Sequence, residues 1–250
     1  MGWIRFLIRF PLTLIYVLIS FILLVLLHVF GGQNWFQSRF GKKVIVTWLR
    51  LFVHMYSMKL YVEGKPEPGL LVANHISWLD IHVVLANIAS RFVSKESISR
   101  WPVLGLLPKW SGTFFLQRGS AAAVSRLNTE IVEALRQGDT VAVFPEGTTH
   151  DGTRVHRFYS AILQAGLDAG TKVQALAIRY ERAGKRDTVM PFIDNEPFVS
   201  NVLRILKSSG THVHLYFCPA FIPDETNRKE LAEHLRAQIQ EQFDKHPLDG

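Results

Sequence analysis

The sequence predicts an α/β domain with a mixed, largely parallel sheet covered by helices, preceded by an N-terminal membrane-binding element of two helices. Two observations predict this fold. Beyond about residue 58, short β-rich runs alternate with helical ones, as in domains whose parallel strands are joined by helices. Before that point, residues 10–30 contain no Lys, Arg, Asp or Glu. We therefore divide the chain into membrane-anchoring helices at 1–58 and an α/β domain at 59–250.

The run at residues 10–30 is about long enough to cross a bilayer. It exceeds the roughly 7–15 apolar residues of a signal peptide, so we interpret it as a retained anchor. Arg50 and His54 interrupt a second apolar stretch, residues 44–58, at helical spacing. This pattern favours an amphipathic, interfacial helix, with an ordinary core-facing helix as the alternative. Whether the first run spans or forms a hairpin in one leaflet, the basic residues that follow it place the domain on the cytoplasmic side.

Short runs rich in β-branched and aromatic residues predict the strands of the domain. They comprise residues 59–64, 69–74, 91–95, 112–118, 140–144, 172–180 and 212–218. Helical patterns predict helices at 77–89, 120–137, 160–169, 198–208 and from about 225. Gly138 marks the end of one of them. In such sheets, functional residues gather in loops at the carboxyl ends of strands.

Composition and charge narrow the function classes. The net charge is +7 and the isoelectric point is about 9.6, but the basic residues form neither a stripe nor a nucleic-acid-binding module. We expect membrane lipids or an anionic substrate as partners, and no nucleic acid. Cys218 is the only cysteine, which excludes an internal disulfide and a Cys-rich metal site. His212 and His214 alternate along one predicted strand without a nearby carboxylate cluster, so we predict no metal site.

The stretch LLVANHISWLD places His75 five residues before Asp80, where a buried strand ends. Ser77 and Asp80 also match a capping box, which alone would explain the carboxylate. With His75 in the turn and Asp80 in the first turn of a helix, the carboxylate would project back toward the imidazole. It would then orient a general base, as the acid does in a hydrolase triad. No Gly-x-Ser-x-Gly elbow is present, so we expect the activated alcohol to belong to the substrate.

A second motif, VAVFPEGTTHDG, is a buried strand that breaks into a turn. Glu146 follows the strand, as His75 follows its own. Gly147 permits a backbone conformation that exposes amides, and Thr148 and Thr149 add hydroxyl groups, so this turn could hold an anion. An ordinary strand-ending turn is the alternative.

Taken in order, NHISWLD, GTFFLQR and FPEGT resemble the glycerolipid acyltransferase family, which includes bacterial 1-acylglycerol-3-phosphate, lysophospholipid and lyso-ornithine-lipid acyltransferases. The resemblance covers residues 60–220, and the family also has an N-terminal membrane-binding two-helix element. It implies that His75 is the general base and Asp80 its partner. It implies acceptor binding by residues of the second and third motifs: Gly112, Phe115, Arg118, Glu146, Gly147, Thr148 and Thr149. A looser run ahead of the second motif contains Lys95, Pro102 and Gly105.

The implied activity is direct acyl transfer at the cytoplasmic face of the inner membrane. His75 would take the proton of the lysolipid hydroxyl as it attacks the thioester carbonyl of acyl-CoA or acyl-carrier protein, the co-substrate. No cofactor or metal is implied. The first expected acceptor is 1-acyl-sn-glycerol-3-phosphate, which would give phosphatidic acid.

Two cationic positions of the phosphatidate-forming members are missing, and their Val-Pro-Ile-x-Pro strand is replaced by VQALA at 173–177. The residue after Glu-Gly-Thr is commonly arginine, which can hold a phosphomonoester, and here it is Thr149. The following Phe-Lys-x-Gly block reads FYSA at 158–161. Arg154 and Arg157 could compensate. The changes also resemble relatives that acylate lyso-ornithine lipid or other lysophospholipids, which are the alternative acceptors.

Two other classes remain open. A membrane-tethered thioesterase would use a similar base to activate water and would release free fatty acid, but it would not need the acceptor motifs. A lipid-binding module without catalytic activity would not need His75 and Asp80 together.

Overall fold

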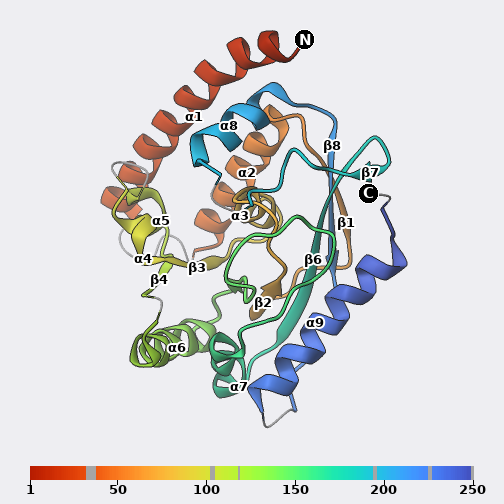
Figure 1. The fold of residues 1–250 in the computed structure, drawn as a ribbon. Coiled ribbons are helices and arrows are strands. Elements are labelled where there is room, and N and C mark those ends of the chain that lie inside the picture. The colour runs from red at the N-terminus through yellow and green to blue at the C-terminus, as the bar shows by residue number, and fades with distance from the viewer. Residues whose placement is uncertain (32–37, 102–104, 118, 194–195, 225–226, 249–250) are drawn as a thin grey trace.

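The computed structural model describes residues 1–250 except 32–37, 102–104, 118, 194–195, 225–226 and 249–250. Within this part of the chain, helices cover an eight-stranded sheet (Figure 1). Its strands are β1 (Lys59–Glu63), β2 (Leu70–Ala73), β3 (Arg91–Lys95), β4 (Phe114–Leu116), β5 (Val141–Val143), β6 (Val173–Arg182), β7 (Lys185–Arg186) and β8 (Thr211–Phe217). The helices are α1 (Gly2–Gly31), α2 (Arg39–Met55), α3 (Leu79–Leu85), α4 (Glu96–Ser99), α5 (Leu106–Trp110), α6 (Ala121–Arg136), the 3₁₀ helix η2 (Ser160–Leu163), α7 (Gln164–Ala169), α8 (Phe198–Lys207) and α9 (Arg228–Lys245).

The strand order is β1-β8-β6-β2-β5-β3-β4, and the short β7 pairs with the end of β6. The five strands from β6 to β4 are parallel to one another. β8 is antiparallel to β6 and parallel to β1, so β8 and β1 run opposite to the rest. The sheet is mixed and largely parallel, as the sequence predicts. Because β2 and β5 are neighbours, the loops after their carboxyl ends meet at the same end of the sheet.

The central strands are buried on both faces, which explains why they read as continuous apolar runs. Along β2, Leu70 and Val72 enter the core that is shared with α6, α7 and α9. Leu71 and Ala73 point the other way, into the core shared with α2, α3 and α8. The sheet thus separates two helical layers.

The helix bounds follow local signals. The hydroxyl of Ser120 accepts the amide N–H of Ala123 at 3.2 Å and caps α6, as expected of a serine at this position. The predicted helix at 160–169 divides into η2 and α7. The helix predicted from residue 77 to 89 is shorter at both ends. It begins later because the carboxylate of Asp80 binds the amides of Ile76 and Ser77 and holds them in a turn ahead of α3.

The N-terminal helix α1 extends along one side of the molecule (Figure 1). Its segment Gly2–Leu27 is long and apolar enough to cross a membrane. The same helix is joined to the domain, because buried Arg9 donates to the carbonyl oxygen of Leu206 at 3.4 Å, and the ring of Tyr16 stacks on Trp48 with centroids 4.7 Å apart. Charged Arg9 therefore lies inside the helix, before the predicted charge-free run.

Helix α2 faces the core over its C-terminal half. Phe52, Val53 and Tyr56 are buried in the same core as β2 and β6. This part of α2 packs as in the core-facing alternative, and contact of the rest of the helix with a membrane interface stays a prediction. Phe40 and Leu51 of α2 remain exposed. The division of the chain at residue 58 stays a prediction.

Candidate active site

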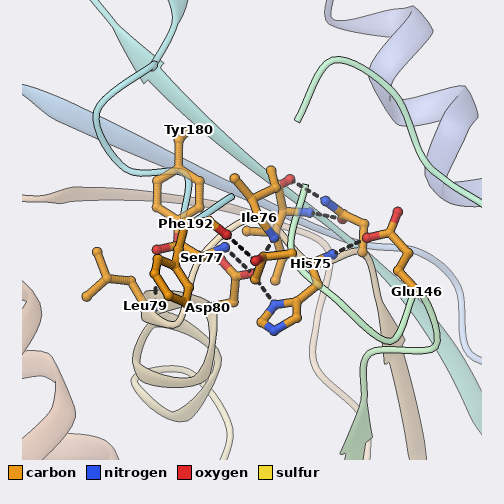
Figure 2. A network of polar contacts seen from close by, with 11 residues as sticks. His75, Ile76, Ser77, Leu79, Asp80, Glu146, Tyr180 and Phe192 are labelled. Carbon is orange, nitrogen blue, oxygen red and sulfur yellow. Dashed lines mark hydrogen bonds and ion pairs between the residues drawn. The ribbon is translucent and has the colours of Figure 1, made fainter. Parts of the chain in front are cut away.

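His75 and Asp80 meet beyond the carboxyl end of β2. Asn74 fixes the start of this turn, because its side-chain amide exchanges two hydrogen bonds with the backbone of Ile178 on β6, at 3.0 and 2.8 Å. Nδ1 of His75 then lies 2.8 Å from Oδ2 of Asp80 (Figure 2). The five-residue spacing works because the imidazole stands in the turn and the carboxylate in the first turn of α3.

The fully buried carboxylate of Asp80 accepts four hydrogen bonds. Oδ2 accepts Nδ1–H of His75, the N–H of Ile76 at 2.7 Å and the N–H of Ser77 at 3.0 Å. Oδ1 accepts the hydroxyl of Tyr180 at 2.7 Å. These donors compensate for the loss of water around the carboxylate. The sequence offers two alternative roles for Asp80, the helix cap and the partner of the imidazole. In the structure its carboxylate fulfils both, because it binds the amide of Ser77 and Nδ1 of His75.

Tyr180 is a site residue that the sequence analysis missed. Burial raises the pKa of its phenol well above the usual value, and the charge of Asp80 raises it further, so the hydroxyl stays protonated and donates. The available signal was a tyrosine inside a buried strand, because a buried phenol needs a hydrogen-bond partner. The sequence could not name that partner.

The imidazole of His75 is held in one orientation. Phe144, directly after β5, stacks on it with ring centroids 4.1 Å apart and planes 9° apart. With Nδ1 directed to Asp80, the other nitrogen, Nε2, is free to accept a proton. The side chain of His75 is 18% exposed, so this nitrogen can be reached by a substrate.

Glu146 ties two loops together. Its carboxylate is buried; Oε2 accepts the backbone N–H of His75 and Oε1 accepts the backbone N–H of His156, both at 2.7 Å (Figure 2 shows the first). Burial raises the pKa of this carboxyl to about 7, although the two amides lower it. The N–H of His150 also donates to the carbonyl oxygen of His75 at 2.9 Å. Both oxygens of Glu146 are therefore occupied by backbone, and its headgroup role stays a prediction.

The other residues of the third motif are placed differently from one another. Gly147 has a φ of +73°, and a Cβ there would lie 3.3 Å from the ring of Tyr159, so glycine suits this turn twice over. Thr148 is exposed. The hydroxyl of Thr149 donates to the carbonyl oxygen of Phe192, in the segment after β7.

Comparison with known proteins identifies the family. The sequence profile of the acyltransferase family matches residues 58–179. A lyso-ornithine lipid O-acyltransferase of Pseudomonas aeruginosa is 34% identical over 185 residues, which cover 74% of this chain and 71% of that protein. The chain belongs to the acyltransferase family. A 1-acyl-sn-glycerol-3-phosphate acyltransferase of Neisseria meningitidis is 35% identical to this acyltransferase over 183 residues, 70% of this chain and 71% of the relative.

A solved structure shows the same fold. The crystal structure of the 1-acyl-sn-glycerophosphate acyltransferase of Thermotoga maritima superposes on this acyltransferase with a TM-score of 0.63 at 22% sequence identity. The match covers 95% of this chain and 97% of that one. The likeness therefore includes the N-terminal region as well as the α/β domain.

The second motif of the acyltransferase lies toward the edge of the sheet. The carbonyl oxygen of Gly112 accepts Nε–H of Arg91 at 2.7 Å, and Phe115 stands on β4. The described contacts do not join either residue to His75. Arg118 lies outside the described residues, and so does Pro102 of the looser run. In that run Lys95 ends β3, and a Cβ on Gly105 would lie 2.7 Å from three carbonyl oxygens.

The two histidines of β8 share one carboxylate. Nε2 of His214 lies 2.8 Å from Glu181 on β6, and Nδ1 of His212 lies 3.6 Å from it. The sequence analysis missed Glu181 because it lies on the neighbouring antiparallel strand. In the described part of the chain, no group of three or more His, Cys, Asp or Glu is arranged to hold a metal ion.

Proposed function

We propose that this acyltransferase moves a fatty acyl group from a thioester, acyl-CoA or acyl-carrier protein, to the free hydroxyl of a lysolipid, with His75 as general base. The observation that carries the proposal is the 2.8 Å hydrogen bond between Nδ1 of His75 and Oδ2 of Asp80, which leaves Nε2 as the proton acceptor. The relatives from Pseudomonas and Neisseria, both named for lysolipid acylation, support the acceptor class.

The reaction follows from this geometry. Nε2 of His75 removes the proton of the acceptor hydroxyl while the oxygen bonds to the thioester carbonyl carbon. Asp80 stabilises the imidazolium that forms. Collapse of the tetrahedral intermediate breaks the C–S bond, and the imidazolium returns the proton to the leaving thiolate. The products are the acylated lipid and a free thiol, and the residues named here suffice for each proton transfer.

The first acceptor that we propose is 1-acyl-sn-glycerol-3-phosphate, which would give phosphatidic acid. Arg154 and Arg157 are exposed on the loop that follows Glu146, and the charge of Arg154 acts on His150 in the same loop. Lyso-ornithine lipid is the second candidate. It is favoured by Thr149, which replaces a phosphate-binding arginine and whose hydroxyl is engaged by Phe192.

The apolar helix α1 and the lipid-acylating relatives indicate association with a membrane. We propose that this is the inner membrane and that the catalytic domain lies on its cytoplasmic face. The basic residues that follow the apolar run support this orientation.

The test is a radiolabel assay with purified protein in detergent. Oleoyl-CoA and palmitoyl-carrier protein serve as donors; lysophosphatidate, lysophosphatidylethanolamine and lyso-ornithine lipid serve as acceptors. We expect labelled lipid product, and its loss in His75→Ala but not in the control His212→Ala on β8. Label found as free fatty acid in place of acylated lipid would make the protein a thioesterase. Full lipid acylation by His75→Ala would refute the proposed base.

A further inference from the structure

The loop after β5 carries two more imidazoles close to His75. The rings of His150 and His156 stack face to face, with centroids 3.6 Å apart and planes 9° apart. Both residues are half-buried. Within the described residues, no hydrogen bond reaches the ring nitrogens of either one. The stacked pair therefore presents ring nitrogens that a ligand can engage.

The backbone fixes this pair relative to His75. The N–H of His150 donates to the carbonyl oxygen of His75 at 2.9 Å. The carboxylate of Glu146 binds the N–H of His156 and that of His75, each at 2.7 Å. Three histidine backbones are thus joined through one buried carboxylate and one amide. The stacked rings cannot drift far from His75 without breaking these bonds.

The surroundings of the pair favour an anion. Burial lowers the pKa of His150, and the neighbouring His156, His75 and Arg154 lower it too, against the opposing charge of Asp151. Groups that carry or can take up positive charge therefore outnumber the acid around this ring. A bound anion would offset their mutual repulsion and would accept ring N–H groups.

The expected substrates bring an anion to this place. In lysophosphatidate the phosphate is a few covalent bonds from the hydroxyl that is acylated, and in lyso-ornithine lipid the carboxylate is a few bonds from its hydroxyl. When that hydroxyl lies at Nε2 of His75, the anion is only a few bonds away and within reach of the loop whose backbone is bonded to His75. Thr149 cannot supply a positive charge there, because its side chain is neutral and its hydroxyl donates to the carbonyl oxygen of Phe192.

We propose that the stacked pair of His150 and His156 binds the anionic headgroup of the acceptor, a phosphomonoester or a carboxylate, and thereby selects the lysolipid. The inference rests on the proposed acyl transfer at His75 and names the acceptor side of the same site. In this role the pair takes the place of the arginine that is absent at Thr149.

The experiment uses the full chain in mixed micelles, with the acceptor varied as mole fraction. His150→Phe, His156→Phe and the double variant keep an aromatic ring for stacking but remove the N–H donors, and His212→Phe on β8 is the matched control. We expect KM for the anionic acceptor to rise about ten-fold or more, with a smaller change in kcat and an unchanged KM for oleoyl-CoA. Such a pattern is the loss of acceptor binding common to ground and transition states. Near-ultraviolet circular dichroism checks that each variant is folded.

Comparison of the two acceptors distinguishes a phosphate-binding site from a carboxylate-binding site. A rise in KM for lysophosphatidate indicates a phosphate subsite, and a rise for lyso-ornithine lipid indicates a carboxylate subsite; unchanged KM for both acceptors in the double variant overturns the inference. A wild type that acylates no lysolipid would overturn the proposed function instead. Calorimetric titration with glycerol 3-phosphate and N-acetylornithine then measures anion binding by His150 and His156 independently of catalysis. Undiminished binding to the folded double variant contradicts the inference.

Discussion

The hydroxyl of Tyr180 donates to Oδ1 of Asp80 at 2.7 Å, across 100 residues of sequence. The other carboxylate oxygen faces His75. Tyr180 stands on β6, the neighbour of the strand from which His75 emerges. A buried phenol therefore holds the carboxylate that orients the imidazole, and we assign it a positioning role.

Replacement of Tyr180 by Phe removes only the hydroxyl that holds Oδ1 of Asp80. We expect kcat to fall about ten-fold and the free energy of unfolding to fall by about 1–3 kcal/mol, because a buried charged acceptor loses one donor. Tyr61→Phe on the exposed strand β1 is the control and should change neither quantity. An equal loss of stability with unchanged kcat would mean that Tyr180 supports the fold but not the imidazole.

Replacement of Asp80 by Asn tests the orientation of His75. The amide oxygen can still accept, but the proton on Nδ1 is no longer secured, and we expect kcat to fall about 10³–10⁴-fold, as in other imidazole–carboxylate pairs. The same change in a His75→Ala background should cost almost nothing further, since the two residues act as a unit. Additive losses in the double variant would contradict that coupling.

Replacement of Arg9 by Leu tests the attachment of α1. The buried guanidinium bonds the carbonyl oxygens of Leu206 and Ser208 and lies 2.8 Å from the hydroxyl of Ser57. We expect the free energy of unfolding in detergent to fall by about 1.5–3 kcal/mol, the range for hydrogen bonds to charged groups. Arg5→Leu, one turn earlier on the same helix, is the control, and an equal effect there would show that the loss is not specific to these contacts.

Local patterns predict the strands well because each central strand is apolar on both faces and is bounded by turn residues. They also predict the meeting of His75 and Asp80, since both belong to one turn and one helix start. They could not predict Tyr180 as the partner of Asp80, because that contact depends on β6 lying beside β2 in the sheet order. The same holds for Glu146, whose backbone partners come from two loops that only the folded sheet brings together.

Replacement of Glu146 by Gln should change how the free energy of unfolding depends on pH. The pKa of this carboxyl is raised to about 7 by burial, above its ordinary value of 4.5. The native state therefore binds more protons than the unfolded state in this interval, and the wild-type free energy of unfolding loses up to about 3 kcal/mol from this group as pH rises through it. Glu146→Gln lacks this loss, so the free energy of unfolding of the variant minus that of the wild type should increase from pH 4.5 to 7. A difference that stays constant with pH would contradict the raised pKa.

For His82 we expect the opposite change of the unfolding free energy with pH. Its half-buried ring stacks on Phe52 with ring centroids 4.3 Å apart, and burial lowers its pKa from 6.5 to about 4. Here the unfolded state binds more protons between pH 4 and 6.5, so the wild type gains up to about 3 kcal/mol as pH rises through that interval. In His82→Leu this gain is absent, and the free energy of unfolding of the variant minus that of the wild type should decrease from pH 4 to 6.5. The contributions of Glu146 and His82 to the pH dependence of stability nearly cancel in the wild type. Denaturant unfolding at several pH values must therefore compare each variant with the wild type. If the two differences in unfolding free energy changed with pH in the same direction, one of the two pKa assignments would be refuted.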